Sequence, residues 1–160
     1  MGIEIEKKYL VEKDKWNNSV KGEKHSLRQG YISTDLNKII RVRLVDNRGY
    51  LTIKGFAKDY SRPEFEYQIP VNEANELLDK FCTSEINKVR YIVPYKGKVW
   101  EVDEFLGSNL GLIIAEIELS NESEPVDLPD WVYKEVTGDE KYYNSNLSIK
   151  PFKNWNDLGD

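Results

Sequence analysis

The stretch Glu4-Ile5-Glu6-Lys7-Lys8 decides the fold, because charged and apolar side chains alternate along most of it. Successive side chains of a β-strand point to opposite faces of the sheet. Glu4, Glu6 and Lys8 therefore share one face of a predicted strand, and Lys7 points away from them. The rest of the sequence indicates where such a charged face can lie.

Like charges recur in pairs on other predicted strands. Five further segments place two charges of the same sign on one strand face, separated by a single residue. These pairs are Arg41/Arg43, Glu64/Glu66, Lys88/Arg90, Glu101/Asp103 and Glu116/Glu118. Neighbouring like charges on a sheet cost about 0.2–1 kcal/mol each unless something neutralises them. A solvated charged face is the simple interpretation, but the repetition favours a face whose charges bind ligands.

Alternating segments of this kind predict eight strands. They are Ile3–Val11, Arg28–Thr34, Ile39–Val45, Tyr50–Gly55, Pro63–Ile69, Ile86–Tyr95, Lys98–Leu106 and Leu112–Ser120. Short polar breaks between several of them are typical of hairpins, which imply an antiparallel sheet. Eight strands can close into a barrel in which alternate side chains point inward. We expect the charged faces inside and the apolar faces outside, against helices or a partner subunit.

Few segments have a helical pattern. Asn72–Phe81 carries apolar residues at the i, i+3, i+4, i+7 spacing of an amphipathic helix. Pro129–Val136 is expected to form a short helix, and the polar segment Glu12–Lys24 a loop or a weak helix. The predicted class is therefore α+β, a closed eight-stranded antiparallel barrel with a few outer helices.

Composition limits the kinds of chemistry. The chain has 160 residues, with 23 Lys and Arg against 28 Asp and Glu, a formal net charge of −5. This length fits one domain over residues 1–160. The acidic balance argues against nucleic-acid binding, and no apolar run suits a membrane span or a signal peptide. One cysteine and one histidine exclude Cys-rich and His-rich metal sites. We expect a cytoplasmic protein that binds no membrane.

The charge pattern itself indicates a ligand. Arg and Lys clusters match phosphate oxygens, and Arg can bind them bidentately. Clustered carboxylates match Mg²⁺, which commonly takes one or two carboxylates together with waters and substrate phosphates. Cations and carboxylates inside one barrel therefore predict a site for a metal-bound polyphosphate.

The same residues resemble a known family, the CYTH-domain proteins of the triphosphate tunnel metalloenzymes. Its opening signature, Glu-x-Glu-x-Lys, matches residues 4–8. Further matches follow in the family's order at Gln29-Gly30-Tyr31, Arg41-Val42-Arg43, Leu51–Gly55, Arg62–Glu66, Lys88-Val89-Arg90, Glu101–Phe105, Ala115–Glu118 and Val136–Asn144. The resemblance covers almost the whole chain.

The resemblance implies an eight-stranded tunnel that binds triphosphates with Mg²⁺ or Mn²⁺. The short bacterial members that this chain resembles most are linked chiefly to hydrolysis of inorganic triphosphate. Nucleoside or thiamine triphosphatase, class IV-type adenylate cyclase and a non-catalytic polyphosphate-binding module stay open as alternatives. A homodimer is also expected, because the family often dimerises and the outer faces are apolar.

Roles follow for the charged residues. The expected phosphate-binding cations are Lys8, Arg41, Arg43, Lys54, Lys88 and Arg90. The expected metal ligands are Glu4, Glu6, Glu116 and Glu118, with Asp103 and Glu101 as weaker candidates for a second metal or a supporting role. Glu64 and Glu66 are expected to orient cations, position water or hold a second metal.

Tyr31 is the remaining catalytic candidate. In similar bacterial enzymes a tyrosine in a Gln-Gly-Tyr segment is implicated in hydrolysis, so the resemblance implies a role in proton transfer. An unperturbed tyrosine has a pKa of about 10. A cationic lumen is expected to lower that pKa by stabilising the phenolate. The alternative is that Tyr31 only packs or donates a hydrogen bond within its strand.

Overall fold

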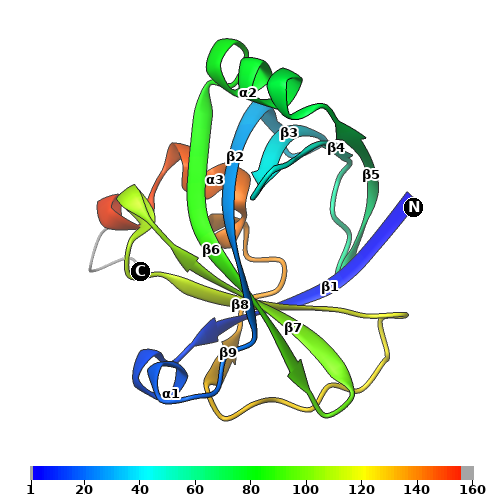
Figure 1. Cartoon of the computed structure of the whole chain (residues 1–160). Coiled ribbons are helices and arrows are strands. Elements are labelled where there is room, and N and C mark those ends of the chain that lie inside the picture. Colours follow the sequence, from blue (N-terminus) through cyan, green and yellow to red (C-terminus); the bar gives the residue numbers. More distant parts are fainter. Residues whose placement is uncertain (1, 156–160) are drawn as a thin grey trace.

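A single antiparallel sheet curls into a barrel. The computed structural model describes residues 2–155. Its strands are β1 (Gly2–Val11), β2 (Glu23–Asp35), β3 (Lys38–Val45), β4 (Arg48–Lys54), β5 (Ser61–Ile69), β6 (Ser84–Tyr95), β7 (Lys98–Phe105), β8 (Ile113–Glu118) and β9 (Val132–Glu135). The strand order is β5-β4-β3-β2-β6-β7-β8-β1-β9, and β5 also pairs with β1. This last pairing closes eight strands into a ring (Figure 1).

Helical segments connect or follow the strands. They are α1 (Lys13–Asn17), α2 (Val71–Lys80), α3 (Asn144–Ile149) and three 3₁₀ turns, η1 (Gly107–Asn109), η2 (Glu140–Tyr142) and η3 (Phe152–Asn154). In Figure 1, α2 covers the end of the barrel near β3 and β4, and its contacts are with these strands and β2. None of the helices within residues 2–155 is long and apolar enough to cross a lipid bilayer.

Strand β1 holds the barrel closed. Its first half, Gly2–Ile5, pairs with β5, and its second half, Glu6–Leu10, pairs with β8. Residues Tyr9–Val11 pair in addition with β9. Glu4, Glu6 and Lys8, the inward charged residues of β1, therefore lie where the sheet closes between β5 and β8.

The eight predicted strands and the α+β barrel are confirmed, and the helix predicted over Asn72–Phe81 is α2. The helix predicted over Pro129–Val136 is wrong, because residues 132–135 form β9. Pairing with the edge of β1 decides the conformation of this segment, and such a distant partner leaves no local pattern. Within Glu12–Lys24 only Lys13–Asn17 is helical, and the side chain of Glu12 caps it by accepting from Lys15 N.

Apolar side chains pack on both sides of the ring, and the aromatic cluster lies outside it. Trp16 of α1 packs edge-on against Trp131 at 5.1 Å between ring centroids, and Trp100 packs against Trp131 at 5.9 Å. The expectation of apolar packing outside the ring is confirmed by this first cluster.

A second cluster lies inside the barrel, since Leu10 shares the inward face of β1 with Lys8 and Tyr31 borders the central cavity. Leu147 of α3 belongs to the same cluster. The expectation of a purely charged interior is wrong, because the second cluster occupies inward-facing positions on the same strands as the charges.

Helix α2 packs closely on the sheet through a small residue. Ala74 and Leu78 of α2 are buried with Val42 in one cluster. A Cβ added to Gly49 of β4 would lie 2.7 Å from the Ala74 Cβ and 3.1 Å from the Ile69 carbonyl oxygen. Neither atom is the flexible end of a long side chain, so the strand and the helix would have to separate.

We predict that Gly49→Ala lowers the free energy of unfolding by about 1–3 kcal/mol, the usual cost of overpacking. Urea denaturation measures this change. Ala74→Gly added to Gly49→Ala removes the clashing methyl group, although glycine costs about 1 kcal/mol in a helix. If the two substitutions prove strictly additive, the contact between Gly49 and Ala74 does not limit stability.

Candidate active site

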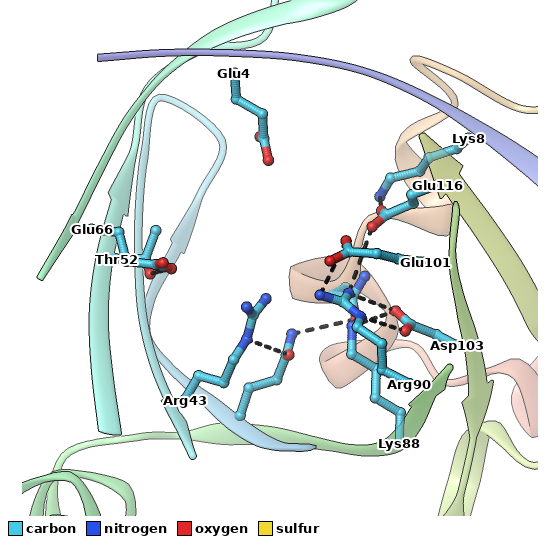
Figure 2. A network of polar contacts seen from close by, with 12 residues as sticks. Glu4, Lys8, Arg43, Thr52, Glu66, Lys88, Arg90, Glu101, Asp103 and Glu116 are labelled. Atoms are coloured by element: carbon cyan, nitrogen blue, oxygen red, sulfur yellow. Dashed lines mark hydrogen bonds and ion pairs between the residues drawn. The ribbon is translucent and has the colours of Figure 1, made fainter. Parts of the chain in front are cut away.

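Charged side chains from all around the ring line one central cavity of about 170 Å³. A single water needs only about 10–15 Å³, so the cavity has room for a larger ligand. It is lined by all six predicted cations, Lys8, Arg41, Arg43, Lys54, Lys88 and Arg90. The predicted carboxylates Glu4, Glu6, Glu64, Glu66, Glu101 and Glu116 line it as well, together with Tyr31. Figure 2 shows two charged walls facing each other across an open space.

Strand register neutralises most of the like-charge pairs. Lys8 lies opposite Glu116, Lys54 opposite Glu64, and Arg90 opposite Asp103 on neighbouring strands. The corresponding side chains form ion pairs with N–O distances of 3.3, 3.6 and 2.7 Å. Four of the five like-charge pairs, Glu64/Glu66, Lys88/Arg90, Glu101/Asp103 and Glu116/Glu118, therefore have one member paired with an opposite charge on the neighbouring strand.

Two further ladder positions bring acids together. Glu6 lies opposite Glu118, and Glu101 lies opposite Glu116. Glu118 itself is exposed and borders an outer depression that it shares with Glu4, Glu6 and Glu116, rather than the central cavity. This side of the barrel concentrates negative charge.

Asp103 is placed behind the cavity wall instead of on it. Its carboxylate is 2% exposed and accepts two hydrogen bonds from Arg90, at 2.7 and 2.9 Å. Lys88 Nζ lies 2.8 Å from the same carboxylate. Both oxygens are thus engaged with cations, and Asp103 fixes the positions of Lys88 and Arg90.

The opposite wall is built from β2, β3, β4 and β5. Arg41 Nη2 donates to Thr52 Oγ1 at 3.1 Å and to Glu66 Oε2 at 3.3 Å, and Thr52 donates to Glu66 at 2.8 Å. Arg43 Nε donates to Gln29 Oε1 at 3.3 Å. Glu66 thus orients Arg41, which is one of the roles expected for it.

Some lining residues were not predicted. Arg62, Tyr143, Asn144 and Ser145 also border the cavity. Arg62 precedes the Glu64/Glu66 alternation by the same two-residue step, which is a signal that could have identified it. The last three residues come from the segment that begins α3. Tyr143 and Asn144 lie in the family match Val136–Asn144, but no alternation of charges there indicates contact with the barrel interior.

The cations are incompletely balanced. Burial, together with Arg41 and Arg90, lowers the pKa of Arg43 to about 10. Burial also lowers the pKa of Lys88, to about 7. Asp103 opposes this shift, whereas Arg90 and Arg43 reinforce it. Groups whose charged forms are this unfavourable would be stabilised by a bound anion.

The carboxylates show the opposite imbalance. Burial, Glu116 and Glu4 together raise the pKa of Glu6 to about 8. Burial alone would also raise the pKa of Glu116, but Lys8 and Arg90 outweigh it and lower that pKa to about 2. A divalent cation beside Glu6 would relieve this repulsion, and carboxylate oxygens suit Mg²⁺.

The structure does not present a finished metal site. Among residues 2–155 no three His, Cys, Asp or Glu side chains are arranged to hold a metal ion. Glu4 is paired with Lys54 at 3.1 Å and Glu116 with Lys8 at 3.3 Å. These lysines form ion pairs with carboxylates that a metal ion would need as ligands. The carboxylates therefore fit a metal ion only when the lysines bind another anion instead.

The expected lowering of the Tyr31 pKa is wrong. Tyr31 is 2% exposed, and burial raises the pKa of its phenol although Arg41, Gln29 and Arg43 oppose the rise. Its oxygen accepts a hydrogen bond from Gln29 Nε2 at 2.8 Å. Tyr31 therefore keeps its proton at neutral pH and can donate it, which makes it a poor general base.

Known proteins match both the sequence and the fold. The family model of the CYTH domain matches residues 2–149. An inorganic triphosphatase of Acetivibrio thermocellus is 51% identical over 156 residues, which cover 97% of this chain and 99% of that protein. An inorganic triphosphatase of Nitrosomonas europaea is 32% identical over 152 residues, covering 91% and 97%. The crystal structure of an inorganic triphosphatase, 30% identical, has a TM-score of 0.64 and covers 91% of this chain and 97% of its own.

We predict that Asp103→Asn lowers the free energy of unfolding by about 3–5 kcal/mol, because it leaves buried Lys88 and Arg90 without their counter-charge. Asp79→Asn is the matched control, since Asp79 forms a largely exposed pair with Arg28 at 3.1 Å and should change stability by at most about 1 kcal/mol. Urea denaturation compares the two variants. Equal midpoints would contradict the anchoring role of Asp103.

We predict that the free energy of unfolding of the Glu6→Gln variant increases relative to that of the natural protein as pH rises. The folded pKa of Glu6, about 8, lies above its ordinary value of 4.5, so folding favours the protonated carboxyl. The stability that the protonated Glu6 carboxyl adds to the folded state is complete below pH 4.5 and is lost as pH rises through 8. Without metal, the stability of Glu6→Gln relative to the natural protein should increase by about 1–3 kcal/mol over this range, since one pKa unit corresponds to about 1.4 kcal/mol.

Urea denaturation in EDTA at several pH values between 5 and 9 measures the effect of Glu6→Gln. Glu76→Gln, on the exposed surface of α2, controls for the loss of one negative charge. A stability difference that stays constant across the range would show that Glu6 is not under strain from its neighbours.

Proposed function

This chain belongs to the CYTH domain family, and we propose that it is a triphosphatase that hydrolyses inorganic triphosphate to pyrophosphate and phosphate. Water attacks a terminal phosphorus, the bridging P–O bond breaks, and pyrophosphate leaves with that oxygen. The observation that carries the proposal is the cavity itself, where a surplus of buried cations and a cluster of repelling carboxylates share one space. The named relatives, 51% and 32% identical, support the same activity.

The cations have the chemistry for holding the phosphates. Phosphoryl transfer depends on positioning and on neutralising charge spread over the phosphate oxygens. In Figure 2 the side chain of Arg43 lies on the wall that faces Lys88 and Arg90, and Arg41 lines the same cavity, so a linear triphosphate between them can contact both walls. Asp103 and Glu66 preorganise these cations before the substrate arrives.

The carboxylates have the chemistry for holding Mg²⁺ or Mn²⁺. Glu4, Glu6 and Glu116 would be the ligands inside the cavity, with Glu118 and Glu101 at the outer depression. Such an ion supplies charge neutralisation and a more acidic bound water. When phosphate oxygens take over Lys8 and Lys54, these lysines release Glu116 and Glu4. Metal and substrate would therefore assist each other's binding.

Without metal and substrate, two groups in the cavity have a pKa near neutrality. Lys88 has a pKa of about 7 and Glu6 of about 8, and an efficient acid or base has a pKa near the working pH. Tyr31, which keeps its proton, suits the role of hydrogen-bond donor to a phosphate oxygen. Because a bound metal would keep Glu6 ionised and a bound phosphate would keep Lys88 protonated, none of these three side chains is assigned as the general base.

The alternative substrates differ from inorganic triphosphate in what is attached to it. Nucleoside and thiamine triphosphates present the same phosphate chain, and an adenylate cyclase would also need a place for adenine and ribose. A polyphosphate-binding module would bind without turnover. Phosphate release from tripolyphosphate, ATP and thiamine triphosphate, each with Mg²⁺, Mn²⁺ or EDTA, distinguishes these functions.

We predict that Lys8→Ala lowers kcat/KM for tripolyphosphate by about 10²–10³-fold, the range seen when one transition-state donor is removed. Lys7→Ala is the matched control, because Lys7 is the next residue on β1 but lies over the ring of Tyr60, with 5.0 Å from Nζ to the centroid. It should stay within about threefold of the natural protein. Equal losses in the two variants would contradict substrate binding by the inward face of β1.

The expected homodimer and cytoplasmic location stay predictions. Ile3, Ile53 and Phe65 are exposed on β1, β4 and β5, and Ile53 lies directly opposite Phe65. This apolar outer face supports self-association, which sedimentation velocity would measure.

A further inference from the structure

Unpartnered polar atoms point to a ligand contact that the charge pattern does not reveal. Among the described residues, three buried side-chain atoms lack a hydrogen-bond partner: Arg41 Nε, Trp100 Nε1 and Ser145 Oγ. Arg41 and Ser145 both line the central cavity, whereas Trp100 lies in the outer core. Buried polar groups in folded proteins nearly always have a partner, so each exception calls for an explanation. A bound phosphate would supply one for Arg41 and for Ser145.

Ser145 belongs to a segment that is attached to the cationic wall of the cavity. Ser145 is the second residue of α3, is 2% exposed, and α3 packs against β6 and β2. The preceding side chain, Asn144, accepts hydrogen bonds from Lys88 Nζ at 2.8 Å and from Gln29 Nε2 at 3.3 Å. The start of α3 is therefore tied to the part of the wall formed by β2 and β6.

The backbone of Ser145 is held in place independently of its hydroxyl. Ser148 Oγ donates to the Ser145 carbonyl oxygen at 2.6 Å and also contacts Ser84 Oγ at 2.7 Å. Ser148 thus has a structural role that its hydrogen bonds fully account for. Ser145, three residues earlier on the same short helix, keeps a hydroxyl that satisfies nothing within the described chain.

We propose that Ser145 is a substrate-binding residue whose hydroxyl donates a hydrogen bond to an oxygen of the phosphoryl group nearest α3, beside Lys88. The inference extends the triphosphatase function proposed above and depends on it. A hydroxyl adds a directional donor where the neighbouring contacts are cations, so it fixes the orientation of that phosphoryl group. The start of α3 thereby becomes part of the substrate site, which otherwise consists of strands.

The matched pair Ser145→Ala and Ser148→Ala tests this proposal. For each variant, isothermal titration in EDTA gives the affinity for tripolyphosphate without turnover, and urea denaturation gives the stability without ligand. Ser145→Ala should weaken tripolyphosphate binding by about 10- to 100-fold, as expected for a hydrogen bond to a charged group. Its urea midpoint should equal or exceed that of the natural protein, because no hydrogen bond within the chain is lost.

Ser148→Ala should show the opposite pattern, with a lower urea midpoint and an affinity within about threefold of the natural protein. If Ser145→Ala binds tripolyphosphate as tightly as the natural protein, Ser145 is not a ligand, while the triphosphatase function stands. A loss of stability in Ser145→Ala with unchanged affinity would likewise assign it a structural role. If the natural protein neither binds tripolyphosphate in EDTA nor hydrolyses it with Mg²⁺, the proposed function fails, and this inference fails with it.

Discussion

A charge can be buried in the barrel only if a counter-charge lies within reach, and this constraint organises the interior. Removing one partner from a buried ion pair leaves an uncompensated charge, which is strongly destabilising. The strand register meets the requirement by placing Arg90 opposite Asp103 and Lys8 opposite Glu116. The pairing also explains why doublets of like charge can be tolerated on single strands.

The charges in the cavity are unbalanced in two places, and the excess charge has opposite sign in each. The side around Arg43 and Lys88 has too much positive charge, and the side around Glu6 has too much negative charge. A pure anion-binding pocket would need only the first of these. Their coexistence in one cavity favours a ligand that is itself a pair, a polyphosphate with its cation.

Much of the fold and the site follows from local sequence, because side-chain direction in a strand alternates every residue. That rule is enough to predict that Glu4, Lys8 and Arg41 point into the same interior. It does not reveal burial or distant partners, so it gave the wrong direction for the pKa of Tyr31 and missed the pairing of β9 with β1. It also places Asp103 in the charged set without showing that Lys88 and Arg90 take up its oxygens.

The double pairing of β1 has a consequence for the order of assembly. Strands β2 to β5 form successive hairpins and can pair as soon as they are synthesised, but β1 needs β5 on one side and β8 on the other. Contacts between residues far apart in the chain form slowly, since a long loop must close first. Strand β1 is synthesised before both of its partners and is therefore among the last strands to find its place. Because it carries Glu4, Glu6 and Lys8, an incompletely synthesised chain has no finished cavity.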